Sequence, residues 1–209
     1  MADSSDITIS GMTTMATDVA IEIAFATDIS ITGVSLSDVR YGVYAYGSSG
    51  VSAGDSTLYG CEKAVYFVGS SGTITNVVIN GSSVGLVLED SSAEISGSEI
   101  FSCGYAAQVY RSDARIIETN AIGNSYGIQA LTGSSLLIKD SNISENIFYG
   151  VYVYSSMAQI LGTDIIANGL TTGVEYPAGI KAINSTLIAK NIRVIDNGYG
   201  IYCDQSVVT

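Results

Sequence analysis

The sequence GVYAY occupies residues 42–46, and the closely similar GVYVY occupies residues 150–154. In both, a small residue precedes apolar positions separated by one residue, which is the period-2 alternation of a β-strand. The spacings between nine such segments are 22, 22, 21, 21, 21, 23, 29 and 21 residues, so the chain is a repeat protein. The segments begin at Ala20, Gly42, Ala64, Gly85, Ala106, Gly127, Gly150, Gly179 and Gly200.

Each repeat has room for three strands. The first strand is followed by a polar corner, as at 48–50, and by a second alternating stretch, as at 136–138. A third apolar pair, as at 77–79, precedes the bend that returns to the next small residue. Three strands in about 22 residues leave no room for a helix. The sequence therefore predicts an all-β fold, a right-handed parallel β-helix (solenoid) of about nine coils with three short strands each.

Composition excludes several classes of protein. The chain of 209 residues is 47% apolar, yet no stretch approaches the roughly 18 apolar residues of a membrane span, so we expect no membrane insertion. Acidic residues outnumber basic ones by 20 to 8, and a net charge of −12 argues against nucleic acid as a partner. The chain has no His, the commonest general base and metal ligand.

Over residues 7–206 the sequence resembles the right-handed parallel β-helix repeat family, the pectin-lyase-like superfamily of carbohydrate-binding and sugar-cleaving proteins. The resemblance implies the fold and a polysaccharide or glycan as partner, but one fold hosts many functions. The family also stacks like residues at its corners. Four asparagines before the repeated glycines are similar to such a ladder: Asn124, Asn146, Asn168 and Asn197.

The three cysteines are expected to be unpaired packing residues. Cys61 and Cys103 hold the place of the asparagine ladder in two earlier coils, about 10 Å apart and too far for a disulfide. Cys203 is expected to face inward beside Ile201. Without His or CxxC spacing, no metal site is predicted.

We expect residues 1–6 to be disordered or added ahead of the repeat. Residues 7–209 are expected to form a single β-helix domain, a segment of a longer solenoid. The longer spacing of 29 residues predicts a longer coil at 157–185.

Insertions in solenoids collect where binding occurs. The additional residues of the long coil fall at 168–178 and carry Glu175 and Tyr176. We expect this loop to overhang the outward face of the first strand near Tyr152, Tyr154 and Lys181. A tolerated surface insertion with no role in binding is the alternative.

Twelve of the 14 tyrosines fall on or beside one outward face of the first strand of the repeat. Tyrosine combines a flat apolar ring with a hydrogen-bonding hydroxyl, which suits glycans and protein surfaces alike. Tyrosines also stack along parallel sheets for stability alone, and that alternative stays open. The candidate ligand-binding residues are Tyr44, Tyr46, Tyr66, Tyr110, Tyr152, Tyr154, Tyr176 and Tyr202.

The resemblance also implies two kinds of catalytic site with which this sequence can be compared. Lyases of the superfamily use Ca²⁺ held by several Asp with an Arg or Lys base, and hydrolases use clustered Asp, in one branch with a His and an Arg-x-Lys motif. This chain has no His and no Arg-x-Lys, and we expect no Arg or Lys flanked by an acidic ladder on one sheet. The densest acidic group is Glu89 with Asp90 and Glu94. If the chain is an enzyme, Glu89, Asp90 and Glu175 are the candidate catalytic residues, and Ca²⁺ enters only as a lyase cofactor.

Three functions follow in order of preference. The first is a non-catalytic module of an extracellular or cell-surface protein, such as an adhesin, that binds a glycan or a partner surface through the tyrosines and needs no cofactor or metal. The second is a fragment of a polysaccharide lyase or glycoside hydrolase. The third is a structural spacer or fibre unit that forms homo-oligomers through its strand edges or its tyrosine face.

Overall fold

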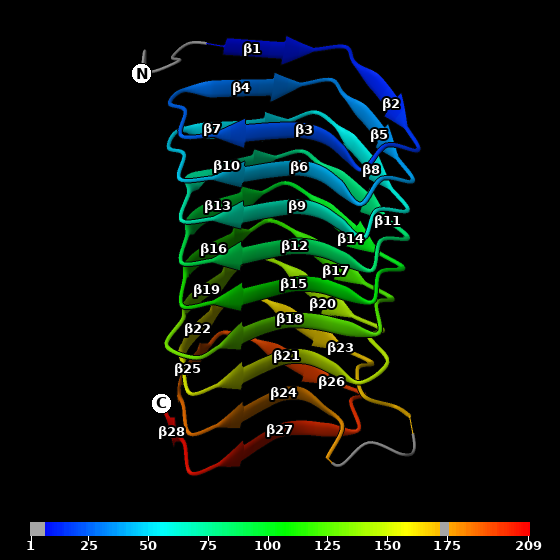
Figure 1. The fold of residues 1–209 in the computed structure, drawn as a ribbon. Coiled ribbons are helices and arrows are strands. Elements are labelled where there is room, and N and C mark those ends of the chain that lie inside the picture. Colours follow the sequence, from blue (N-terminus) through cyan, green and yellow to red (C-terminus); the bar gives the residue numbers. More distant parts are fainter. Residues whose placement is uncertain (1–6, 172–175) are drawn as a thin grey trace.

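The computed structural model describes residues 7–171 and 176–209. Over these residues the chain forms only strands joined by turns and bends, which wind into a right-handed rod (Figure 1). The predicted all-β solenoid of about nine coils is confirmed. The described residues contain no helix, and therefore none that could cross a membrane. Expectations for residues 1–6 and Glu175 lie outside the described residues.

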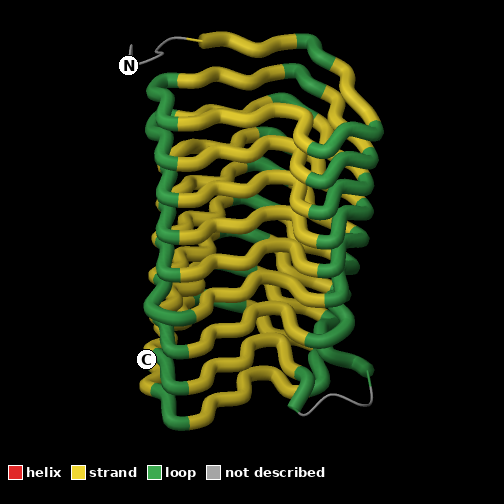
Figure 2. Tube along the Cα trace, viewed as in Figure 1, coloured by secondary structure: helices red, strands yellow, loops and turns green. Residues whose placement is uncertain are grey.

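Three parallel sheets run the length of the rod, and their turns stack in columns at the corners (Figure 2). The first sheet contains β1 (Ile7–Ser10), β4 (Ile29–Thr32), β7 (Val51–Gly54), β10 (Ser71–Thr75), β13 (Ser92–Ser96), β16 (Asp113–Ile117), β19 (Ser135–Lys139), β22 (Met157–Leu161), β25 (Thr186–Lys190) and β28 (Val207–Val208). The second sheet contains β2 (Thr13–Met15), β5 (Ser35–Ser37), β8 (Thr57–Tyr59), β11 (Val78–Asn80), β14 (Glu99–Phe101), β17 (Asn120–Ile122), β20 (Asn142–Ser144), β23 (Asp164–Ile166) and β26 (Arg193–Ile195).

The third sheet is formed by the strands of the repeated signature, and we call it the tyrosine sheet. It contains β3 (Val19–Ala24), β6 (Tyr41–Tyr46), β9 (Lys63–Val68), β12 (Val84–Glu89), β15 (Tyr105–Tyr110), β18 (Tyr126–Leu131), β21 (Tyr149–Tyr154), β24 (Ala178–Ile183) and β27 (Tyr199–Asp204). Each strand pairs with the strand three places later in the chain, so equivalent positions of successive coils lie over one another at the usual ~4.8 Å.

Aliphatic side chains fill the tube enclosed by the three sheets. On the tyrosine sheet, Val43 and Val151 belong to one inward row, and both are at most 1% exposed. The row ends at Ile201 in β27, which is 43% exposed because no further coil covers it. Cys203 occupies an inward position on the same strand, as expected, and is exposed in this last coil.

Side chains at the corner between the second sheet and the tyrosine sheet form the predicted ladder. The backbone N–H of Asn124 donates to Asn146 Oδ1 at 3.0 Å, and that of Asn146 donates to Asn168 Oδ1 at 3.1 Å. Cys103 occupies the same row, since its backbone N–H donates to Asn124 Oδ1 at 2.9 Å. Cys61 precedes it by two coils, and both cysteines are buried and unpaired, as predicted. The ladder satisfies backbone donors that the turn leaves without a partner in the sheets.

We predict that Asn146→Ala lowers the free energy of unfolding by about 3 kcal/mol. Asn146 is 1% exposed, and its Oδ1 accepts from both the backbone N–H and the side-chain Nδ2 of Asn124 at 3.0 Å. Its Nδ2 donates to the carbonyl of Ala121, also at 3.0 Å. Truncation therefore leaves several buried groups unpaired. Urea unfolding followed by circular dichroism measures the loss.

Asn142→Ala is the matched control for this prediction. Among the described residues Asn142 Oδ1 is buried without a hydrogen-bond partner, so its removal is expected to cost less than about 1 kcal/mol. Equal losses in the two variants would show that the ladder does not contribute to stability as described.

Candidate functional site

The tyrosine sheet presents three outward rows to solvent, and together these rows form the tyrosine face. In the middle row Glu22 lies opposite Tyr44, and Tyr44 lies opposite Tyr66 in the next coil. In the third row Glu89 lies opposite Tyr110. Both rows have the register predicted from the sequence. The twelve tyrosines of the face are Tyr41, Tyr105, Tyr126, Tyr149 and Tyr199 in the first row, Tyr44, Tyr66, Tyr152 and Tyr202 in the middle row, and Tyr46, Tyr110 and Tyr154 in the third row.

The rings gather into clusters along the rod. Near the N-terminal end, Tyr44 packs against Tyr41, Tyr46 and Tyr66 with ring centroids 5.2 to 5.6 Å apart. In the centre, Tyr126 packs against Tyr105, Phe148 and Tyr149 at 4.6 to 6.0 Å. Near the C-terminal end, Tyr202 packs against Tyr176 and Tyr199 at 4.5 and 6.2 Å. Seven of the eight candidate tyrosines therefore lie on the face itself, and Tyr176 joins it from the loop before β24.

The rings use part of their own faces to contact each other. Tyr105 and Tyr126 stack at 4.6 Å with an angle of 8° between their planes, and Tyr44 stacks on Tyr66 at 5.2 Å with 21°. A ring inside such a stack turns its faces toward its neighbours rather than toward solvent. The surface left for a ligand is therefore composed of ring edges and hydroxyl groups, together with the outer faces of the rings that end each stack.

Sequence reasoning missed several members of these clusters. Phe25 meets Tyr46 edge-on at 4.9 Å, and Phe148 extends the central stack. Tyr105 and Tyr126 belong to the central cluster but are not among the eight candidate ligand-binding tyrosines. Their position, one residue before the small residue of each repeat, is the signal that could have identified them.

Lys181 lies within the C-terminal cluster and is only 8% exposed. Its Nζ donates to the Tyr149 hydroxyl at 3.2 Å and lies 5.6 Å from the centroid of the Tyr202 ring. Tyr176 lies near Lys181 as expected, with the centroid of its ring 5.8 Å from Lys181 Nζ. Its ring stacks on Tyr202 of β27 at 4.5 Å, whereas Tyr152 and Tyr154 were the tyrosines expected beside it.

The candidate catalytic acids are held by other groups. Glu89 accepts a hydrogen bond from the Tyr66 hydroxyl at 3.1 Å. Asp90 accepts two from Arg111, both at 2.8 Å, and this guanidinium holds the pKa of Asp90 below its usual value. An ionised carboxylate in an ion pair is a poor proton donor. Glu175 lies outside the described residues.

One basic residue in the bends before the strands of the tyrosine sheet lies between two acidic ones. Arg40 lies between carboxylates of adjacent coils, 3.8 Å from Asp18 and 3.5 Å from Glu62. All three side chains are more than half exposed, so this is a solvated ion-pair network.

Burial raises the pKa of several tyrosine hydroxyls of the face. It is the main cause that raises the pKa of Tyr44, Tyr110, Tyr126 and Tyr152 above the ordinary value. Burial also raises the pKa of Tyr66, and its hydrogen bond to the Glu89 carboxylate raises it further. The face therefore presents neutral hydroxyls, each able to donate and to accept a hydrogen bond.

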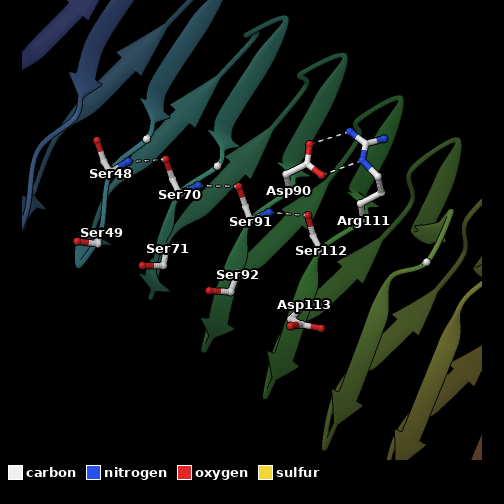
Figure 3. Close-up of a pocket in the computed structure, with 13 residues that line it drawn as sticks. Ser48, Ser49, Ser70, Ser71, Asp90, Ser91, Ser92, Arg111, Ser112 and Asp113 are labelled. Carbon is white, nitrogen blue, oxygen red and sulfur yellow. Dashed lines mark hydrogen bonds and ion pairs between the residues drawn. The ribbon is translucent and has the colours of Figure 1, made fainter.

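A polar groove of about 710 Å³ follows the corner between the tyrosine sheet and the first sheet. Its inner serines bond to each other's backbone, as where the Ser48 N–H donates to Ser70 Oγ at 3.1 Å (Figure 3). Ser71 and Ser92 form part of an outer row, with the Asp90–Arg111 pair to one side (Figure 3). A second hollow of about 760 Å³ lies further along the same corner. Because the third row of tyrosines ends at this corner, the groove adjoins the tyrosine face.

Comparison with known proteins identifies a family and confirms the fold. A family model described as periplasmic copper-binding protein (NosD) matches residues 3–176. The A-module of the mannuronan C-5 epimerase AlgE4 of Azotobacter vinelandii superposes with a TM-score of 0.54 at 14% identity, covering 88% of this chain and 65% of that one. The catalytic domain of a GH87 α-1,3-glucanase in complex with tetrasaccharides gives 0.54 at 11% identity, covering 98% of this chain and 59% of that one. The chain thus spans less than two thirds of either structure, and no curated protein matches it.

The description of the matching family names copper, and the donor groups of this chain do not fit that metal. The chain has no His, and copper prefers imidazole and soft sulfur ligands. Cys61 and Cys103 are separated by the coil that contains Ser82, and Cys203 lies in the last coil. Over residues 7–171 and 176–209, no three His, Cys, Asp or Glu side chains form a group that could hold an ion. We therefore assign no copper site to these residues.

We predict that the folded protein loses stability as the pH rises above 10.0, the ordinary pKa of tyrosine. The pKa of Tyr66 is higher in the folded protein than in the unfolded chain, so above this pH the unfolded chain binds fewer protons. Above pH 10.0 unfolding therefore becomes more favourable as the pH rises. Below that pH Tyr66 is protonated in both the folded and the unfolded protein, so it does not change the free energy of unfolding. Urea unfolding at several values between about pH 9 and pH 11 measures the trend.

Tyr66→Phe isolates the contribution of this hydroxyl. The variant is expected to lose less stability than the parent over the same alkaline range. Cys61 and Cys103 are present in both proteins, so ionisation of these thiols contributes equally to the two slopes. Identical slopes for parent and variant would contradict the assignment of the raised pKa to Tyr66.

Proposed function

This chain belongs to the family described as periplasmic copper-binding protein (NosD), and from that premise we propose that it is a non-catalytic β-helical module that binds a glycan outside the cytoplasm. The observation that carries the proposal is the alignment of twelve tyrosines in three rows on one sheet. The family description supports a periplasmic location, and the cell surface is the related alternative.

The chemistry of the tyrosine face suits a sugar polymer. A sugar presents C–H groups that pack on aromatic surface and hydroxyls that donate and accept hydrogen bonds, and the face offers ring edges and neutral hydroxyls side by side. Its groups repeat at the ~4.8 Å spacing of the coils, so a ligand with a repeating unit can make the same contact many times.

Rigidity contributes to binding by such a surface. The rings are held by their neighbours, as in the stack of Tyr105 on Tyr126, and lose little conformational freedom when a ligand arrives. The serine-lined groove beside the face extends the polar surface along the rod. A long, shallow and preorganised surface favours an extended polymer over a small metabolite, which requires a deeper and more apolar pocket.

The arrangement of the acids supports binding rather than catalysis. Asp90 is paired with Arg111, and Glu89 accepts a hydrogen bond from Tyr66. The hydrogen bonds from Arg111 lower the pKa of Asp90, so Asp90 does not have the environment of a carboxylic acid that keeps its proton near neutral pH. The two solved structures that share the fold are named for enzymes that act on glycans, which supports a glycan as the class of ligand.

We predict that Tyr44→Ala combined with Tyr152→Ala weakens glycan binding by more than about tenfold. The two residues lie in the middle row, in separate clusters, so their loss removes ring and hydroxyl contacts at two points of the face. A glycan array followed by calorimetry with the best ligand measures the change, and circular dichroism shows whether the variant remains folded.

Tyr59→Ala is the control for this double variant. Tyr59 lies on β8 of the second sheet and is 51% exposed, so its loss removes an exposed tyrosine without altering the tyrosine face. If the double variant binds as well as the parent, or if Tyr59→Ala weakens binding equally, the tyrosine face is not the glycan-binding surface.

A further inference from the structure

The basic side chains on and beside the tyrosine face are already occupied. Arg40 contacts the carboxylates of Asp18 and Glu62, and its guanidinium carbon also lies 4.8 Å from the centroid of the Tyr41 ring. Arg111, where the face meets the groove, has both of its hydrogen bonds to Asp90. The charge of each guanidinium is therefore partly offset by carboxylates before an anionic ligand arrives.

The two lysines of the face are held by tyrosine rings. Lys63 Nζ lies 3.6 Å from the centroid of the Tyr66 ring, which is a close cation–π contact. Lys181 is 8% exposed, donates to the Tyr149 hydroxyl, and lies 4.9 Å from the centroid of the same ring. These contacts also show that the tyrosine clusters accommodate ammonium groups.

Two carboxylates of the face, by contrast, form no ion pair among the described residues. Glu22 is exposed at the N-terminal end of the middle row, directly opposite Tyr44. Glu89 accepts its hydrogen bond from the neutral Tyr66 hydroxyl and lies opposite Tyr110. The two glutamates are three coils apart, about 14 Å along the rod, with the N-terminal tyrosine cluster between them.

We propose that the glycan recognised by this face carries amino groups, and that its ammonium groups bind at Glu22 and Glu89, next to Tyr44 and Tyr66. This inference rests on the proposed function and names the class of its ligand. Carboxylates that form no ion pair among the described residues, beside tyrosine hydroxyls whose oxygens accept hydrogen bonds, form a surface complementary to an amine-bearing sugar chain. The separation of the two carboxylates requires an oligomer rather than a single sugar.

The same charges disfavour an acidic glycan. An oligo-uronate on this face would meet the carboxylates of Glu22 and Glu89, while Lys63 and Lys181 are engaged with tyrosine rings. The net charge of −12 of the whole chain also slows the approach of a polyanion and speeds that of a polycation. We therefore expect anionic glycans to bind this face more weakly than amine-bearing glycans.

The test compares three oligosaccharides of one length. Calorimetric titrations of the full chain use a tetramer of glucosamine, its fully N-acetylated counterpart, and a tetramer of galacturonate, at about pH 6, where sugar amines are protonated and Glu side chains are ionised. The expected result is that the amine-bearing tetramer binds at least about tenfold more tightly than the acetylated one. Its affinity should fall as salt is added, and the uronate should not bind measurably.

A charge-neutral variant locates the effect. Glu22→Gln combined with Glu89→Gln keeps the shape of both side chains and leaves an oxygen to accept from Tyr66, so the fold is expected to persist. This variant should bind the amine-bearing tetramer no better than the acetylated one. Glu99→Gln combined with Glu118→Gln removes the same charge from exposed residues away from the tyrosine face and should retain the preference.

Three other outcomes would contradict the inference, and each has a different consequence for the proposed function. If the acetylated tetramer or the uronate binds as tightly as the amine-bearing one, the proposed function stands and the inference about its ligand falls. If both double variants lose affinity equally, the effect is one of net charge, and the two glutamates are not the site. If the amine-bearing tetramer shows no binding, the inference falls, and a panel in which no other glycan binds removes the proposed function as well.

Discussion

The hydrogen bonds between successive coils are the constraint on which the rest of this structure depends. Each strand pairs in register with its equivalents before and after it, so that Tyr105 lies over Tyr126 and Asn120 lies over Asn142. A repeat in sequence thereby becomes a set of straight rows in space. Inward rows fill the tube, corner rows of Asn and Ser satisfy buried backbone groups, and outward rows build the tyrosine face.

The same register determines what the face can bind. Rings that are forced to follow one another at the coil spacing pack against each other, as Tyr44 does on Tyr66. The stack stabilises the rod but leaves mainly ring edges and hydroxyls for a ligand. Basic side chains are drawn into the same stacks, as Lys181 is, whereas Glu22 at one end of a row has no ion-pair partner among the described residues. Recognition by hydrogen bonds and by charge follows from this arrangement.

The sequence predicts the rows of this protein much better than it predicts the contacts within them. Period-2 alternation inside a regular repeat determines which face each residue occupies, so the rows of Tyr44 and Glu89 could be predicted, and the family resemblance implied the asparagine ladder. The position of Tyr176 could not be predicted, because an insertion of irregular length has no register with the neighbouring coils. The ion pairs of Arg40 depend on side-chain conformations that the pattern does not specify.

The most direct test of this account is a glycan titration of the protein labelled with ¹³C in its tyrosine rings, observed by NMR. The account predicts that ring resonances of the tyrosine face, those of Tyr44, Tyr66 and Tyr152 first among them, shift in a saturable way while the Tyr59 resonance does not. Shifts confined to Tyr59, or a ligand that binds without moving any resonance of the face, would contradict the claim that register-aligned tyrosines form the binding surface.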